Sequence, residues 1–102
     1  MSEYVEDVSK YTDNVDADIV DKLIKYCGIA LRTADGKLVA ATDKKELDAV
    51  RDGFAKKKLE LSPDEAQAGI DKTVATLKGV NRKNRVTFYY LLAKHTGTLD
   101  KI

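Results

Sequence analysis

The chain has 102 residues, of which 43% are hydrophobic and 34% charged, and its formal net charge at pH 7 is +1. This length supports one hydrophobic core but not two, so we expect a single helical domain over residues 1–102. The composition excludes a disordered chain, and the longest apolar run, about eight residues, is far below the roughly 20 that a bilayer-spanning helix needs.

Two helices are predicted in the first 28 residues. An apolar stripe at helical spacing is formed by Tyr4, Val8 and Tyr11. This first helix should end near Thr12, and Asp16 is a favourable N-cap for the second. The apolar face of the second helix consists of Val20, Leu23, Ile24 and Cys27. Gly28 should end it.

Residues 29–41 allow two interpretations. Asp35 and Gly36 form a dipeptide that favours tight hairpin turns, and apolar residues lie on both sides of it, so a short two-stranded hairpin is one prediction. The other is a helical turn at residues 37–40, capped by Asp35. An isolated two-stranded hairpin is marginally stable. The helical alternative is therefore slightly favoured.

The next two helices have clear start signals. Asp43 and Glu46 match a capping box, and an apolar stripe then continues to about Lys58. Ser62 and Glu65 form a second box, with a proline at the first helical position. This helix should run to about residue 78, where a glycine stops it.

Residues 86–93 form the most apolar stretch and predict the centre of the core. Their residue types suit either a strand or a helix. The flanks favour a helix that begins near Arg82 or Arg85 with Asn81 or Asn84 as its cap, and that ends before Gly97. A helix that is apolar on nearly every side is buried among several neighbours. We therefore predict an all-α fold, a compact bundle of about five helices around a buried C-terminal helix.

Two stretches carry a resemblance to a known family. They are the run Arg-Val-Thr-Phe-Tyr-Tyr-Leu-Leu-Ala at residues 85–93, with Gly79 and Arg82 before it, and Phe-Ala-Lys-Lys-Lys-Leu at residues 54–59. In these residues the chain resembles a small uncharacterised bacterial family, a domain of unknown function. The resemblance implies a compact helical fold in a bacterial cytoplasm, and it implies no chemistry.

The residues that could support catalysis or metal binding are few. His95 is the only histidine, and no second ligand lies three or four residues from it. Cys27 is the only cysteine, so no intramolecular disulfide can form, which agrees with a cytoplasmic location. Ser9 and Ser62 could supply a nucleophile, but nothing in the spacing places an acid and the histidine beside them. We therefore assign no catalytic, cofactor-binding or metal-binding residue, and we expect that the protein is not an enzyme.

The charges are unevenly distributed. Residues 1–35 contain eight acids and four bases, whereas residues 36–102 contain nine acids and fourteen bases. The favoured interpretation is that the two halves attract each other within the domain. The alternative is that the basic side binds an anionic partner.

The residues that point most specifically to an anionic partner are Arg82, Lys83 and Arg85. These cations lie at a helix start, where the helix dipole disfavours positive charge. Either acids from residues 1–35 compensate them, or a bound phosphate does. The other basic cluster, residues 56–58, is interpreted as a solvated face.

Together these features favour a non-enzymatic, cytoplasmic protein-interaction or structural module. A partner protein is the preferred ligand, and no association with a membrane is expected. The alternative is a weak nucleic-acid or phosphate-binding protein that uses residues 82–85, and an enzyme is a distant third. The sequence leaves open whether the chain is a monomer or a homodimer.

Overall fold

The computed structural model describes residues 2–32, 37–39, 43–80 and 83–102. Five α-helices and three short helices of other types lie in these ranges: α1 (Ser2–Ser9), α2 (Ala17–Cys27), the 3₁₀-helix η1 (Gly28–Arg32), α4 (Lys44–Val50), the π-helix η2 (Arg51–Lys58), α5 (Pro63–Thr76), α6 (Arg85–His95) and the 3₁₀-helix η3 (Leu99–Lys101). The described residues contain no strand. The predicted mainly α bundle is therefore confirmed.

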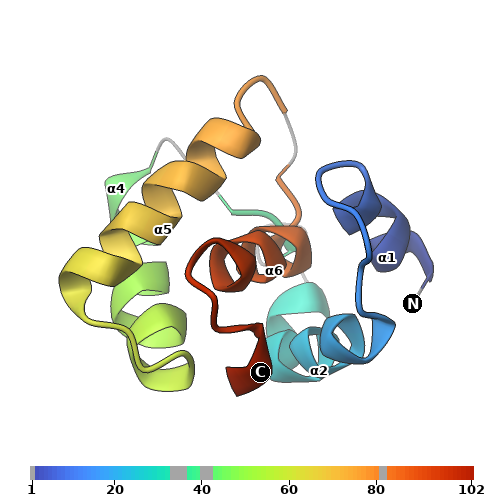
Figure 1. Ribbon diagram of the computed structural model, residues 1–102, viewed down its shortest axis with the longest axis horizontal. Helices are drawn as coiled ribbons and strands as arrows, with labels where there is room; N and C mark the ends of the chain where they lie inside the picture. The colour runs from blue at the N-terminus through green and yellow to red at the C-terminus, as the bar shows by residue number, and fades with distance from the viewer. Residues whose placement is uncertain (1, 33–36, 40–42, 81–82) are drawn as a thin grey trace.

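The centre of the bundle is α6. All eight residues from 86 to 93 are buried, so this helix has no solvent-facing side over its middle turns. Helices α5, α2 and α1 pack against it. Figure 1 shows α6 in the middle of the molecule, with α5 on one side and α1 and α2 on the other. The prediction of a central C-terminal helix is confirmed.

The two ends of α6 are formed differently. Of the two predicted starts, Arg85 is correct, and Asn84 occupies the N-cap position without making a side-chain cap hydrogen bond. Asn81 lies outside the described residues. At the other end Gly97 has a φ of 69°, and the Thr98 amide donates to the Ala93 carbonyl at 2.8 Å. This is the left-handed glycine cap that the sequence predicts.

The second helix agrees with the prediction, whereas the first ends at Ser9, before the predicted end near Thr12. In α1, Val8 is fully buried. At the start of α2, the Asp16 carboxylate accepts from the amides of Asp18 and Ile19, at 2.9 and 3.3 Å. The Asp16 amide itself donates to the Tyr90 hydroxyl at 3.0 Å. The central helix therefore holds the cap of α2 in place.

The hairpin predicted within residues 29–41 is wrong for the described part of this segment. Residues 29–31 belong to η1, and Leu38 forms an isolated antiparallel bridge with Asn84 instead. The Val39 amide donates to the Lys83 carbonyl at 2.8 Å, so this strand-like stretch pairs with the entry to α6. Of the helical turn predicted at residues 37–40, Lys37 is helical, Leu38 and Val39 are not, and residue 40 lies outside the described residues. Asp35 and Gly36 lie outside the described residues.

The helix predicted from residue 44 to 58 changes its winding at Arg51, where α4 gives way to η2. In a π-helix the hydrogen bonds join residues five apart, and the Leu59 amide accordingly donates to the Phe54 carbonyl at 3.1 Å. Phe54, Ala55 and Leu59 are all buried in the core.

The capping box predicted at Asp43 is half correct. The Asp43 carboxylate accepts from the Lys45 amide at 2.9 Å. Glu46 does not return the bond to the cap, because its carboxylate pairs with Arg85 of α6. The box at the start of α5 is complete: the Glu65 amide donates to the Ser62 hydroxyl at 3.2 Å, and the Ser62 amide donates to the Glu65 carboxylate at 3.3 Å.

Helices α5 and α6 approach closely at Gly69. A Cβ atom on this glycine would lie 2.5 Å from a methyl carbon of Thr96 and 2.8 Å from one of Leu92. Real side chains essentially never come this close. A side chain at this position would force the Thr96 and Leu92 side chains to move where α5 crosses α6.

We predict that Phe88→Ala and Leu92→Ala each lower the free energy of unfolding by about 2–5 kcal/mol, because both side chains are fully buried in the central helix. Urea denaturation measures the loss. Lys94→Ala, an exposed position of the same helix, is the control and should change stability by less than about 0.5 kcal/mol. Losses at Phe88 and Leu92 as small as that of the control would contradict the central position of α6.

We also predict that Ser62→Ala lowers the free energy of unfolding by about 1 kcal/mol, because it removes the acceptor of the N-terminal cap of α5. Amide hydrogen exchange should become faster at Asp64 and Glu65. Ser9→Ala is the matched control, since the Ser9 hydroxyl donates only to the Val5 carbonyl on an exposed surface. Unchanged exchange at both amides would show that the cap does not hold this helix end.

Candidate functional site

Arg85 is a half-buried cation that bonds to three separate parts of the fold. Its guanidinium donates to the Tyr89 hydroxyl at 3.0 Å, to the Leu38 carbonyl at 3.2 Å and to the Glu46 carboxylate. Burial alone would lower the pKa of Arg85, but Tyr89 and Glu46 together outweigh it and raise the pKa above its ordinary value. The contacts join α6, α4 and the segment around Leu38.

Lys83 is also held by an internal acceptor, because its ammonium donates to the Val80 carbonyl at 2.7 Å. Arg82 lies outside the described residues. Two members of the predicted anion-binding segment are therefore engaged with the protein itself. Phosphate binding by Arg82, Lys83 and Arg85 stays a prediction.

The acid that pairs with Arg85 was expected to come from residues 1–35, but it is Glu46. Among ion pairs that join two described residues, none connects residues 1–35 with residues 36–102. The acidic half contacts the central helix in another way, since the Thr87 hydroxyl donates to the Asp7 carboxylate. Asp7 thus satisfies the buried hydroxyl of Thr87 on the central helix.

Cys27 is half-buried beside the first turns of α6. Burial raises the pKa of its thiol to about 11, although the nearby charge of Arg85 partly opposes this. A nucleophilic cysteine needs a lowered pKa, because the thiolate is the reactive form. Cys27 lies on the apolar face of α2, and its environment does not favour a reactive thiolate.

His95 lies at the other end of α6. Its Nε2 is 3.3 Å from the Thr76 hydroxyl, and partial burial, together with Lys72 and Lys94, lowers its pKa. Ten residues of helix span about 15 Å, so α6 separates His95 from the surroundings of Arg85 and Cys27. The structure does not bring the candidate nucleophile and the histidine together.

The two candidate serines make local contacts. The Ser9 hydroxyl bonds within α1, and that of Ser62 caps α5. Over the described ranges, no group of three or more His, Cys, Asp or Glu residues could hold a metal ion.

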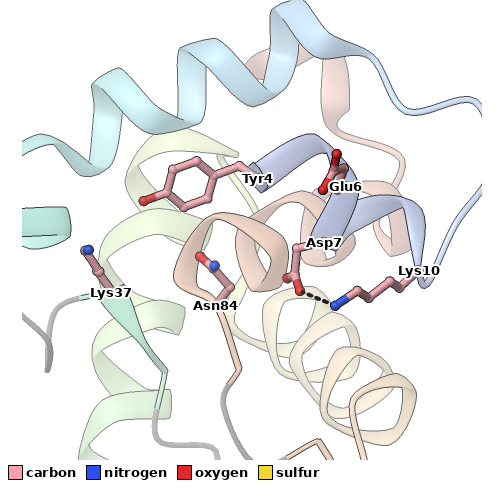
Figure 2. Close-up of a pocket in the computed structure, with 6 residues that line it drawn as sticks. All are labelled: Tyr4, Glu6, Asp7, Lys10, Lys37 and Asn84. Carbon is pink, nitrogen blue, oxygen red and sulfur yellow. Dashed lines mark ion pairs between the residues drawn. The ribbon is translucent and has the colours of Figure 1, made fainter. Parts of the chain in front are cut away.

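A polar pocket of about 240 Å³ lies between α1 and the start of α6 (Figure 2). Its lining residues are Tyr4, Glu6, Asp7, Lys10, Lys37 and Asn84. The Lys10 ammonium is 3.6 Å from the Asp7 carboxylate. The side-chain oxygen of Asn84 is buried and has no hydrogen-bond partner. Sequence reasoning missed this pocket because its residues come from three separate segments, and no local spacing connects them.

A second feature is the exposed ring of Tyr26 at the end of α2. Tyr26 is 45% exposed and is the one large hydrophobic side chain in the described part of the chain that is classed as exposed. Its ring centroid lies 5.5 Å from that of Phe54, which stacks on Tyr89 at 4.0 Å. The Lys58 ammonium lies over the Tyr26 ring, 5.7 Å from its centroid.

The exposed residue Lys22 lies one helical turn before Tyr26 on α2, on the same face. We call Lys22, Tyr26 and Lys58 the Tyr26 surface. The sequence indicated an exposed lysine run at residues 56–58, but it gave no signal that α2 places an aromatic ring beside that run. The surface is thus formed by two helices that are far apart in the sequence.

The comparisons with known proteins agree with the resemblance noted from the sequence. A family model described as a protein of unknown function (DUF2853) matches residues 3–100. No curated protein matches the chain. None of the helices in the described ranges is long and apolar enough to cross a bilayer.

We predict that Glu46→Gln lowers the free energy of unfolding by about 1–3 kcal/mol, the range for a hydrogen bond to a charged group, because the half-buried guanidinium of Arg85 loses its anionic partner. The matched control is Glu60→Gln, which removes an exposed pair with Lys101 and should cost less than about 1 kcal/mol. Chemical denaturation of both variants measures the difference. Equal effects would mean that Arg85 does not depend on Glu46.

Proposed function

The chain belongs to the DUF2853 family of proteins of unknown function, and we propose that it acts as a non-enzymatic protein-interaction module. Its ligand is an acidic segment of a partner protein, and the Tyr26 surface binds it. The observation that carries the proposal is the exposed Tyr26 ring, supported from below by Phe54 and flanked by two lysines. Tyrosines held in this way are frequent energetic centres of protein interfaces.

The chemistry of the Tyr26 surface favours an acidic partner segment. An apolar side chain of the partner would cover the exposed edge of the Tyr26 ring, and carboxylates on either side of it would face Lys22 and Lys58. Phe54 and Tyr89 are buried, and their stacked rings hold Tyr26 in a defined orientation. A ring that is already ordered loses little conformational entropy on binding.

A protein fits this surface better than a nucleic acid. The Lys58 ammonium already covers one face of the Tyr26 ring, so a base could stack there only by displacing it. The net charge of +1 also provides little long-range attraction for a polyanion.

The proposal includes a bacterial cytoplasmic location. The resemblance to a bacterial family supports the source, and the single cysteine is compatible with a reducing compartment. No enzymatic activity is proposed, because the described structure separates His95 from Cys27 and engages Ser9 and Ser62 in local hydrogen bonds.

The test is a peptide-display selection on the immobilised full chain, followed by fluorescence anisotropy with the selected peptides. We expect peptides with Asp or Glu on both sides of one large apolar residue. Tyr26→Ala should weaken their binding by about tenfold or more, the effect of losing an aromatic centre of an interface. Lys58→Glu should weaken peptide binding more at low salt than at high salt, because the lost attraction is electrostatic.

Lys72→Glu is the matched control, since it reverses an exposed lysine near the opposite end of α6 and should leave binding unchanged. Thermal melting of each variant checks that the fold is intact. Selected peptides without acidic enrichment, or peptides that bind Tyr26→Ala as tightly as the unmodified chain, would refute the proposal. Tighter binding of single-stranded DNA than of any selected peptide would favour the nucleic-acid alternative instead.

A further inference from the structure

One exposed face of α2 has a residue pattern that is complementary to itself. It consists of Val15, Asp18, Lys22 and Tyr26, which we call the α2 stripe. The intervals of three, four and four residues are those of a single helix face. Asp18 and Lys22 are exposed, Tyr26 is 45% exposed, and Val15, which precedes the N-cap, is half-buried. The order along the stripe is therefore apolar, acidic, basic and aromatic.

The two charges of the α2 stripe are available to a second molecule. The interval of four between Asp18 and Lys22 would allow a pair within the helix. However, every ion pair that joins two described residues involves other side chains. Helices α6, η1 and α1 pack against α2, whose opposite face carries the fully buried Val20 and Leu23. Figure 1 shows α2 at the lower edge of the molecule.

A second copy of α2 in antiparallel orientation complements the stripe. A two-fold axis that crosses α2 near residues 20–21 places Tyr26 of each copy opposite Val15 of the other. The same axis places Lys22 opposite Asp18, and two-fold symmetry forms each contact twice. The aromatic ring then covers an apolar side chain, and each ammonium faces a carboxylate. A parallel arrangement would place like charges opposite each other, so the pattern selects the antiparallel one.

Further charges favour the same orientation. The exposed residues Asp13 and Asp16 lie on either side of Val15, and the Lys58 ammonium lies over the Tyr26 ring. Antiparallel pairing brings this lysine to the acidic end of the second copy. Residues 13–16 thus have acids on both sides of one apolar residue, the kind of segment proposed for the Tyr26 surface.

We propose that the acidic partner of the Tyr26 surface is the start of α2 in a second copy of the chain, so that the protein forms an antiparallel α2–α2 homodimer. This inference rests on the proposed function and names its partner. The contact runs along one helix of 11 residues, about 16 Å, and is smaller than the interface of roughly 1,200–2,000 Å² that stable complexes bury. We therefore expect a reversible dimer with a dissociation constant of about 100 μM at low salt.

Analytical ultracentrifugation of the unmodified full chain, from about 10 μM to about 1 mM, measures this equilibrium. The average mass should rise from that of the monomer toward that of the dimer. Raising sodium chloride from about 20 mM to about 500 mM should increase the dissociation constant several-fold, because salt screens the ion pairs. Tyr26→Ala should increase it about tenfold or more, because the aromatic contact is lost twice.

Two charge-reversed variants test the antiparallel contact directly. In Asp18→Lys the contact joins two lysines, and in Lys22→Asp it joins two aspartates, so each variant alone should remain monomeric. Mixed one to one, they should dimerise as the unmodified chain does, since every contact in the mixed dimer again joins opposite charges. Lys72→Asp, an exposed position of α5, is the control and should dimerise normally. Thermal melting checks that each variant is folded.

Three results would overturn the proposal. One is a chain that stays monomeric at about 1 mM and low salt. Another is a dimer whose dissociation constant is the same in Asp18→Lys and Tyr26→Ala as in the unmodified chain. The third is a one-to-one mixture of the reversed variants that stays monomeric, which would exclude the antiparallel contact.

The peptide experiment fails or succeeds separately from this one. It is made at about 5 μM chain, where a dimer with the expected dissociation constant is almost fully dissociated. Selected acidic peptides that bind through Tyr26 to a strictly monomeric chain would refute the homodimer and leave the proposed function standing.

Discussion

The rest of the structure depends on the burial of α6 on all sides. A helix satisfies its own backbone hydrogen bonds but cannot cover its side chains, and here eight consecutive side chains must be removed from water. One or two neighbours would leave a strip exposed. Helices α1, α2 and α5 together provide the cover. The surrounding helices are thus arranged so that together they cover the apolar surface of α6 on every side.

Burial alone does not specify where each neighbour sits, and the polar groups of α6 add that information. The Thr87 hydroxyl contacts Asp7 of α1, the Tyr90 hydroxyl accepts from the Asp16 amide at the start of α2, and Arg85 pairs with Glu46 of α4. Each bond satisfies a polar group that would be costly if it were buried alone. Apolar packing therefore determines that the helices associate, while a few polar contacts determine their position.

The features that could be predicted from the sequence depend on residues close together in the chain. An N-cap or a glycine stop is decided within about four residues, so the caps at Asp16, Ser62 and Gly97 were predictable. The apolar stretch at residues 86–93 likewise predicted its own burial. Glu46 could not be assigned to Arg85, because local spacing favoured the capping box and the competing partner lies 39 residues away.

The candidate sites were less predictable for the same reason. The pocket combines α1, Lys37 and Asn84, and the Tyr26 surface combines α2 with η2. The change to π winding at Arg51 was also missed, because the apolar stripe up to Lys58 fits an ordinary helix. The cationic segment near residue 82 was noticed in the sequence. A run of charged residues does not reveal whether acceptors within the protein already bind their side chains, as they do for Lys83 and Arg85.

The position of α6 in the sequence has a consequence for synthesis on the ribosome. The apolar faces of α1 and α2 pack on residues that are translated about 70 positions later, a delay of several seconds at typical elongation rates. Helices of 8 and 11 residues are too short to be stable by themselves in water. The nascent chain therefore cannot bury Val8, Val20 and Leu23 in stages. It must stay largely unfolded, with these side chains accessible to chaperones, until the central helix has left the exit tunnel.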